Sequence, residues 1–496
     1  MFTLRIGEKT ISAAPHTTVL EALRSAGFHP DAPCGGHGSC RKCTVYLDGV
    51  PCLACRTEIT RDAVLTLPDP SAQLLSGSFR PDVLPDGDHR YVLAFDVGTT
   101  TVAGFLLDGV TGQLLSQAAE LNRQQSFGAD VISRIVYARE NGEAPLRSAV
   151  WDTLRSLTHR LCGAAGVDAS WVTLASFAAN PAMHHLLLGL DTEPLVKPPY
   201  MPGVLQALVE ENRGRLPVAE NAVFRVLPNI AGFVGGDTAA CLLSASFDRL
   251  QKLTLLMDIG TNGELVLGDG TRRIACSTAA GPALEGANIF CGMRGTAGAI
   301  DHVRLVHGAL QCSVIGGGKA VGLCGSGLLD AIAVCLELGI IDPSGRMAEA
   351  SVPADRKTAA DGCLALRLQD DVVLTQKDVR QVQLAKAAIR AGIGLLLQQL
   401  DAKPEDISAV LLAGAFGNYL TPASACAIGL LPPLLLERIV PVGNAAGVGA
   451  GMAALSESSF RLASRLAETT EFLELGGLPD FQELYVDCMA FSEEEL

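Results

Sequence analysis

The chain has 496 residues, enough for about three domains of the usual ~100–200 residues. Its net charge of −15 disfavours nucleic acid and anionic membranes as partners, and it contains no apolar run of membrane-spanning length. The first residues form an alternating polar strand instead of a signal peptide, and fifteen cysteines are scattered through Ala/Leu-rich segments. We therefore expect a cytoplasmic protein with reduced thiols, of the kind found in anaerobic cells.

Residues 1–67 are predicted to form a small domain in the order strand, strand, helix, loop, strand. MFTLRI and TISAA alternate apolar and polar residues around a GEK turn. TTVLEALRSAGF predicts a helix that Thr17 or Thr18 caps and Gly27 ends. This order is that of a β-grasp ferredoxin.

The cysteine spacing in PCGGHGSCRKCTVYLDGVPCLACRT indicates a [2Fe–2S] cluster. Cys34, Cys40 and Cys43 share a glycine-rich loop, and Cys55 follows after a short hairpin. The glycines let the backbone curl around the inorganic sulfides and aim N–H groups at them. Cys52 competes for the fourth position, but LACRTEI resembles the last-ligand segment of β-grasp ferredoxins and favours Cys55. The alternative is a zinc site, for which two C-x2-C pairs would serve.

The next segment, residues 68–90, carries four prolines, two glycines and little apolar periodicity. This composition predicts a semi-extended linker between the cluster domain and everything downstream.

An internal repeat follows the linker. YVLAFDVGTTTVAGFLLDGVTG at 91–112 matches LTLLMDIGTNGELVLGDGTRR at 253–273, each an apolar strand that runs into Asp-x-Gly-Thr and then a second strand. Asp96 and Asp258 lie 162 residues apart, about the length of one domain. We therefore predict two homologous lobes, at 91–250 and 251–496.

Each Asp-x-Gly-Thr turn is typical of a phosphate-binding hairpin. A close backbone turn points N–H groups and threonine hydroxyls at phosphate oxygens, while the aspartate holds Mg²⁺, usually through water. Two facing copies would grip the triphosphate of ATP from both sides. The predicted contacts at the hairpins are Asp96, Gly98, Thr99, Thr100, Asp258, Gly260, Thr261, Asn262 and Gly263.

The two hairpins resemble the phosphate motifs of the ASKHA superfamily of acetate and sugar kinases, heat-shock cognates and actin. Residues 229–245 and 443–455 resemble its two connecting helices, whose small residues permit a close crossing at a hinge. Residues 409–420 resemble its adenosine-binding turn, with Gly414 and Gly417 leaving space for a base. The resemblance implies an actin-like, RNase H-like α/β fold for the two predicted lobes at 91–250 and 251–496.

Further residues are expected beside the nucleotide. Gly325, Ser326 and Gly327 are interpreted as a turn at the start of a helix. Asp237 occupies the position at which kinases of this superfamily place a catalytic base; the alternative is a helix cap. A helix capped by Thr375 and Asp378 carries Lys386, a candidate nucleotide contact. The predicted catalytic set is Asp96, Asp237 and Asp258.

The whole chain resembles the reductive activators of corrinoid proteins, through FGADVISRI at 127–135, CSTAAGPALEGANI at 276–289 and GLCGSGLLD at 322–330. The resemblance implies ATP-dependent one-electron reduction of Co(II) to Co(I) in a corrinoid protein of a methyltransferase system. It also implies an upstream donor of the ferredoxin or flavin reductase type, and leaves open a homodimer. The interval from Cys43 to Cys55 is shorter than expected for the family, so the sequence does not identify which protein donates electrons to this domain.

Two other functions remain open from the sequence. One is an activator of a CoA-ester dehydratase or reductase, a class that carries a [4Fe–4S] cluster between subunits, for which no matching cysteine pair is found. The other is a small-molecule kinase with a redox module, which would need an acceptor pocket that the sequence does not define.

Overall fold

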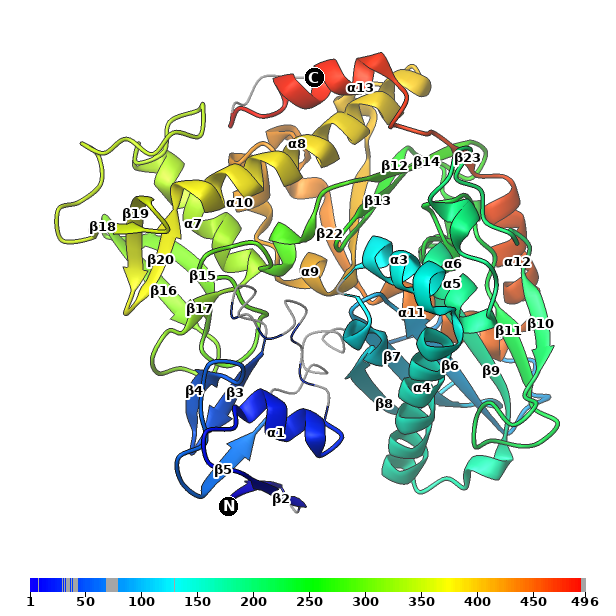
Figure 1. Cartoon of the computed structure of the whole chain (residues 1–496). Helices are drawn as coiled ribbons and strands as arrows, with labels where there is room; N and C mark the ends of the chain where they lie inside the picture. The colour runs from blue at the N-terminus through cyan, green and yellow to red at the C-terminus, as the bar shows by residue number, and fades with distance from the viewer. Residues whose placement is uncertain are drawn as a thin grey trace.

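The computed structural model describes residues 1–7, 9–28, 30, 32, 36, 38, 43–67, 79–128 and 130–491 (Figure 1). Its N-terminal domain is a five-stranded sheet in the order β2-β1-β5-β3-β4 with one helix, α1 (Val19–Ser25). The strands are β1 (Phe2–Ile6), β2 (Lys9–Ala13), β3 (Thr44–Leu47), β4 (Val50–Leu53) and β5 (Ala63–Thr66). Thr18 caps α1 in a capping box with Glu21, which decides between the two predicted caps.

Residues 79–90 pack on the body of the protein. The Phe79 ring stacks on Phe105 with centroids 4.2 Å apart. The Asp86 carboxylate accepts hydrogen bonds from the Glu457 amide at 2.6 Å and the Ser456 hydroxyl at 3.1 Å. The second half of the predicted linker is therefore anchored, and residues 68–78 lie outside the described residues.

Two six-stranded sheets repeat one topology. The first has the order β10-β11-β9-β6-β7-β8 and the second β22-β21-β12-β13-β14-β23. In each, three antiparallel strands are extended by two parallel strands on the side of the first. The first contains β6 (Tyr91–Val97), β7 (Thr101–Asp108), β8 (Leu114–Leu121), β9 (Val172–Ala179), β10 (Leu208–Glu211) and β11 (Val223–Val226). The second contains β12 (Thr254–Ile259), β13 (Gly263–Gly268), β14 (Arg273–Thr278), β21 (Ala409–Ala413), β22 (Ile439–Gly443) and β23 (Glu471–Phe472).

Helices cover both faces of the first sheet. Alternate residues of β6 divide between two cores: Leu93 and Phe95 pack with α4 (Ala144–Ala165) and α5 (Pro181–Leu188), while Val92 and Ala94 pack with α6 (Gly236–Ser244), α11 (Ala445–Leu455) and α12 (Glu457–Glu468). A Cβ on Gly449 of α11 would lie 2.0 Å from the Ala240 carbonyl oxygen of α6, so the two predicted connecting helices cross in backbone contact.

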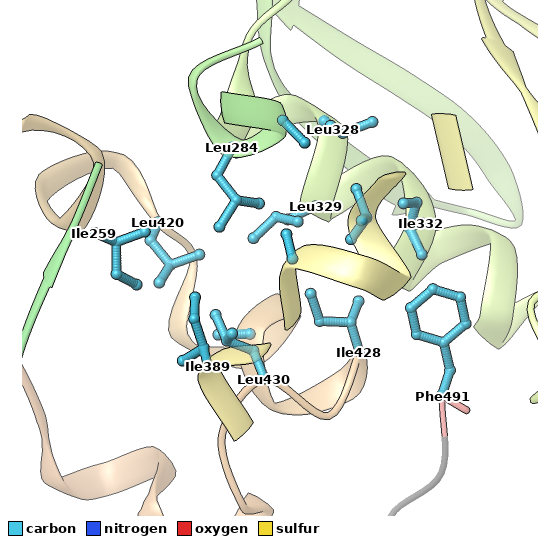
Figure 2. Close-up of a cluster of buried hydrophobic side chains, with 14 of the residues drawn as sticks. Ile259, Leu284, Leu328, Leu329, Ile332, Ile389, Leu420, Ile428, Leu430 and Phe491 are labelled. Carbon is cyan, nitrogen blue, oxygen red and sulfur yellow. The ribbon is translucent and has the colours of Figure 1, made fainter. Parts of the chain in front are cut away.

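The second lobe carries a large insertion between β14 and β21. It holds β15 (Ala299–Val306), β16 (Ala309–Val314), β17 (Gly322–Leu323), α7 (Gly325–Glu337), β18 (Lys357–Ala360), β19 (Cys363–Gln369), β20 (Val372–Thr375) and α8 (Gln376–Gln399). Figure 2 shows Leu328, Leu329 and Ile332 of α7 in the core of this lobe. They pack with Ile389 of α8 and with residues around α9 (Gly414–Tyr419) and α10 (Pro422–Ala427). Thr375 and Asp378 cap α8, as predicted.

The C-terminal helix α13 (Pro479–Asp487) packs on α8 (Figure 1). No helix within the described part of the chain is both long and apolar enough to cross a membrane.

Candidate functional site

A cavity of about 1040 Å³ lies between the two lobes and is lined by both Asp-x-Gly-Thr hairpins. Residues from α3 (Val131–Asn141), from the start of α7 and from the C-terminal segment 474–481 complete its wall. The predicted site residues that line it are Asp96, Gly98, Thr99, Thr100, Asp237, Asp258, Gly260, Thr261, Asn262, Gly325, Ser326 and Gly414.

The first hairpin turn is held from behind by side chains. The carbonyls of residues 98, 99 and 100 accept hydrogen bonds from Asn122 at 2.9 Å, Arg134 at 2.6 Å and Gln125 at 2.8 Å. In a trans peptide plane the carbonyl and the following N–H point in opposite directions. Residues 98–101 line the cavity, and a close turn of this kind can present backbone N–H groups to phosphate oxygens.

Four carboxylates converge at the cavity. Asp96 and Asp258 are the last residues but one of strands β6 and β12, Asp237 lies in the first turn of α6, and Glu264 lies on β13. Burial, followed by the charges of Asp258 and Asp237, raises the pKa of Asp96 to about 7. Burial and the charge of Asp237 likewise raise the pKa of Asp258 to about 7.

The other two carboxyls are perturbed in the same direction. Burial raises the pKa of Asp237 to about 6, although the Thr238 amide donates to its Oδ1 at 2.8 Å. Burial raises the pKa of Glu264 well above its usual range, and the charges of Asp237 and Asp258 add to that effect. A bound cation would relieve this repulsion. Oxygen donors suit Mg²⁺, and within the described residues no group of three acidic, histidine or cysteine side chains could hold a metal alone.

Glu264 and Ser277 are cavity residues that the sequence analysis missed. Asp258, Glu264 and Ser277 form one row across β12, β13 and β14, and the Ser277 hydroxyl donates to Glu264 at 3.3 Å. Strand alternation from Asp258 could have found them, because residues paired across strands share a face. In the first lobe Ala103 and Ala119 occupy the matching row, so only the second lobe adds a carboxylate.

Two asparagines were also missed, and both cap helices at the cavity. Asn444 caps α11, and its side-chain amide donates to the Asp96 carboxylate at 2.9 Å. Asn180 caps α5, and its amide donates to the Thr99 hydroxyl at 2.9 Å. An asparagine directly before a helix signals a cap. The neighbouring sequence does not show that the side-chain nitrogen of that asparagine also reaches a phosphate-binding hairpin.

Three predicted glycines do not line the cavity. A Cβ on Gly327 would lie 2.3 Å from the Ile300 carbonyl oxygen, and one on Gly417 would lie 3.0 Å from the backbone of β21. On Gly263 it would lie 2.8 Å from the Thr278 hydroxyl. The structure gives all three a packing role, and their contact with nucleotide stays a prediction.

Lys386 requires a correction. It does not line the cavity, and its ammonium instead donates to the Ala490 carbonyl and lies 5.4 Å from the centre of the Phe491 ring. Burial lowers the pKa of Lys386 to about 8. It therefore ties the C-terminal segment to α8.

In the N-terminal domain, Cys43 and Cys55 bring their sulfur atoms within 3.2 Å of each other. Cys52 lies on β4 opposite Val45 and packs against the apolar core, where burial raises the pKa of its thiol. A Cβ on Gly36 would lie 3.2 Å from Leu20, and its φ of +100° favours glycine. These features fit the predicted cluster cradle with Cys55 as a ligand, while Cys34 and Cys40 lie outside the described residues.

Comparison with known proteins adds independent findings. A 2Fe-2S iron-sulfur cluster binding domain matches residues 3–80, the RACo middle region matches 91–250, and the C-terminal domain of RACo, the ASKHA domain, matches 252–496. The corrinoid activation enzyme RamQ of Eubacterium limosum is 36% identical over 85% of this chain and 74% of its own length. The Co(II) methylated amine-specific corrinoid protein reductase of Methanosarcina barkeri is 26% identical over 71% of this chain and 68% of its own length.

A solved structure agrees with these matches. The reductive activator for corrinoid, iron-sulfur protein superposes with a TM-score of 0.74 at 28% identity, covering 99% of this chain and 98% of that one. The predicted fold class, a β-grasp ferredoxin followed by two ASKHA lobes, is confirmed.

Proposed function

The chain belongs to the family of reductive activators of corrinoid proteins, and on that premise we propose that it reduces the inactive Co(II) corrinoid of a partner protein to Co(I). One observation carries the proposal: a single chain joins a domain that matches 2Fe-2S cluster binding domains, with the sulfurs of Cys43 and Cys55 3.2 Å apart, to a cavity between two lobes that include an ASKHA domain. A [2Fe–2S] cluster exchanges one electron at a time, which matches the Co(II)/Co(I) step.

ATP is needed because the electron must move uphill. Plant-type clusters have potentials near about −400 mV. Each further ~59 mV of a one-electron step corresponds to about 1.4 kcal/mol. Rotation of the lobes about the α6–α11 crossing would convert ATP binding and hydrolysis into that work.

The cavity residues divide the work on ATP between them. The turn at 98–100 and the matching turn at 260–262 would cradle the phosphates, and Asp96 and Asp258 would hold Mg²⁺, which would supply positive charge to neutralise the developing phosphate charge. Asp237 faces the same space from α6, where it would orient the attacking water. Asn444 fixes the Asp96 carboxylate through its hydrogen bond.

The partners and setting follow from the same proposal. The target is the corrinoid protein of a methyltransferase system, and the electron enters from a ferredoxin or flavin reductase type of donor. We place the protein in the cytoplasm, since fifteen cysteines scattered through Ala/Leu-rich segments fit reduced thiols. A homodimer is one assembly that this proposal permits.

The test uses the full-length protein loaded with its cluster, a low-potential reductant and a corrinoid protein held as Co(II). Visible spectroscopy should show Co(I), or methyl-Co(III) with a methyl donor, only when Mg-ATP is present. Cys55→Ser should hydrolyse ATP without reducing cobalt. Asp258→Asn should keep a reducible cluster and lose ATP hydrolysis by on the order of 100-fold.

Two results would contradict the proposal. One is reduction of Co(II) that is equally fast without ATP. The other is failure with every corrinoid protein tested together with phosphorylation of a small acceptor, which would favour the kinase alternative.

A further inference from the structure

Loop 293–298 of the second lobe touches the nucleotide cavity on one side and the N-terminal domain on the other. Met293, Arg294, Gly295 and Thr296 line the cavity. The next residue, Ala297, accepts a hydrogen bond through its carbonyl from the hydroxyl of Tyr46. In Figure 1 the N-terminal domain lies beside the part of the second lobe that carries β15 and β17.

Both ends of this loop are fixed, while its tip connects the two sites. The Met293 amide donates to the Leu323 carbonyl at 2.9 Å, and the Gly298 amide donates to the Ile315 carbonyl at 2.9 Å. Leu323 lies two residues before the start of α7, whose Gly325 and Ser326 also line the cavity. A change in the cavity can therefore reach the tip at 294–297 over at most three residues, about 10 Å of chain.

Tyr46 stands on the strand that leads out of the cluster site. It lies on β3, which begins directly after Cys43, and β3 pairs with β4, which leads into Cys55. Burial raises the pKa of Tyr46, as expected for a hydroxyl enclosed at an interface. The loop thus meets the N-terminal domain on the strand that positions a candidate cluster ligand.

We propose that loop 293–298 is the coupling element between ATP and the cluster, and that the Tyr46 hydroxyl on the Ala297 carbonyl is its contact point. Arg294 supplies a cationic side chain to the cavity wall three residues before that contact, so nucleotide phosphates have a charge on this loop to act on. The inference rests on the proposed function, because it says how occupancy of the ATP site reaches the cluster domain. Linkage makes it reciprocal: if nucleotide changes docking of the domain, docking changes nucleotide affinity by the same factor.

The test is Tyr46→Phe in the full-length, cluster-loaded protein, with Tyr91→Phe as the control. The Tyr91→Phe substitution removes the same hydroxyl group. It serves as the control because the Tyr91 ring packs on Trp171 in the first lobe, away from loop 293–298. Amide hydrogen exchange is measured at residues 44–47 and 293–298, with and without Mg-ADP. In wild type and Tyr91→Phe, nucleotide should change exchange in both segments.

In Tyr46→Phe the response at 293–298 should persist, and the response at 44–47 should fall by about fivefold, the equilibrium equivalent of one hydrogen bond. The nucleotide dissociation constant should shift in the same variant by up to the same factor. Visible absorption of the cluster should not change.

An unchanged response at 44–47 in Tyr46→Phe would overturn the inference, and so would a wild-type loop that does not respond to nucleotide. Neither result tests whether the protein reduces Co(II) in a corrinoid protein. If exchange is coupled but wild type fails to reduce Co(II) with ATP, the contact stands and the proposed function fails. If wild type and Tyr46→Phe reduce Co(II) with equal dependence on ATP and residues 44–47 never respond, the proposed function stands and this contact fails.

Discussion

At the scale of single residues, the cavity buries carboxyl groups close together, so burial first and mutual repulsion second raise their pKa. Asp96 and Asp258 both have a pKa of about 7 in the folded chain, against about 3.9 for an ordinary aspartate. At a pH between about 4 and about 7, these two carboxyl groups hold protons in the folded chain and have released them in the unfolded chain. The free energy of unfolding therefore falls as pH rises from about 4 to about 7.

Asp258→Asn should remove part of this repulsion. The midpoint of thermal unfolding should exceed that of wild type at pH 8 by about 2–4 °C, the equivalent of ~1 kcal/mol, and the two should converge near pH 4. Scanning fluorimetry without Mg²⁺ checks this. Asp269→Asn is the opposite control: hydrogen bonds from Thr271 and Arg272 lower the pKa of Asp269, so its loss should lower the midpoint at pH 8. A lower midpoint for Asp258→Asn at pH 8 would contradict the argument.

The choice between Cys52 and Cys55 is a second prediction at this scale. Cys52→Ser should keep the visible absorption and the reduced-state EPR signal, because its side chain packs in the core beside Val45. Cys55→Ser should lose or alter both, because its sulfur lies 3.2 Å from that of Cys43. Anaerobic purification of both variants allows the comparison, and the reverse pattern would assign the fourth ligand to Cys52.

Sequence reasoning found the cavity residues whose signal is local. Asp96 and Asp258 stand in short motifs that repeat, so each could be located from its neighbours alone. Asn444 bonds Asp96 from 348 positions away, and nothing in GNAAGVG predicts that pairing. Lys386 was misplaced for the same reason: helical periodicity shows that a face is buried but not which segment covers it.

At the scale of elements, the crossing of α6 and α11 depends on the absence of side chains. Gly449→Ala would place a methyl group 2.0 Å from the Ala240 carbonyl oxygen. The helices must separate, at a cost of about 1–3 kcal/mol typical of overpacking. We expect a lower unfolding midpoint and weaker coupling between ATP hydrolysis and cobalt reduction.

Gly163→Ala is the matched control for that variant. Gly163 lies inside α4, and a Cβ there meets nothing within 4 Å. It should raise stability by roughly 0.5–1 kcal/mol, because alanine favours the helix. If Gly449→Ala and Gly163→Ala shift the midpoint in the same direction, the crossing is looser than the backbone contact indicates.

At the scale of the whole molecule, the arm at 79–90 joins the cluster domain to the ATPase body. Low apolar periodicity predicted a semi-extended linker over 68–90, but it gave no sign that residues 79–90 would pack on the body. Single anchors such as Phe79 and Asp86 carry no periodic signal, and their partners, Phe105 and residues 456–457, are remote in sequence.

Phe79→Ala should release this arm. Loss of the stacked ring pair should lower stability by on the order of 1–2 kcal/mol and raise amide hydrogen exchange over residues 82–88. Cluster absorption should stay unchanged, because the cysteines lie in another domain. Leu84→Ala is the control in the same arm, since Leu84 is 89% exposed and should have no effect on either readout. Equal hydrogen exchange over residues 82–88 in the two variants would show that Phe79 is not an anchor.

The helices α11 and α12 have a consequence for synthesis on the ribosome. They are translated after most of the second lobe, yet they close one face of the first sheet, where the Ser176 hydroxyl donates to the Ala450 carbonyl at 2.5 Å. The first lobe therefore cannot complete its core until about the last tenth of the protein has been made, and until then, of the three helices on this face, α6 alone covers Val92 and Ala94. Contacts of such long sequence separation form slowly. A nascent chain stalled before residue 445 should expose this apolar face to chaperones, and one stalled after residue 468 has emerged should not.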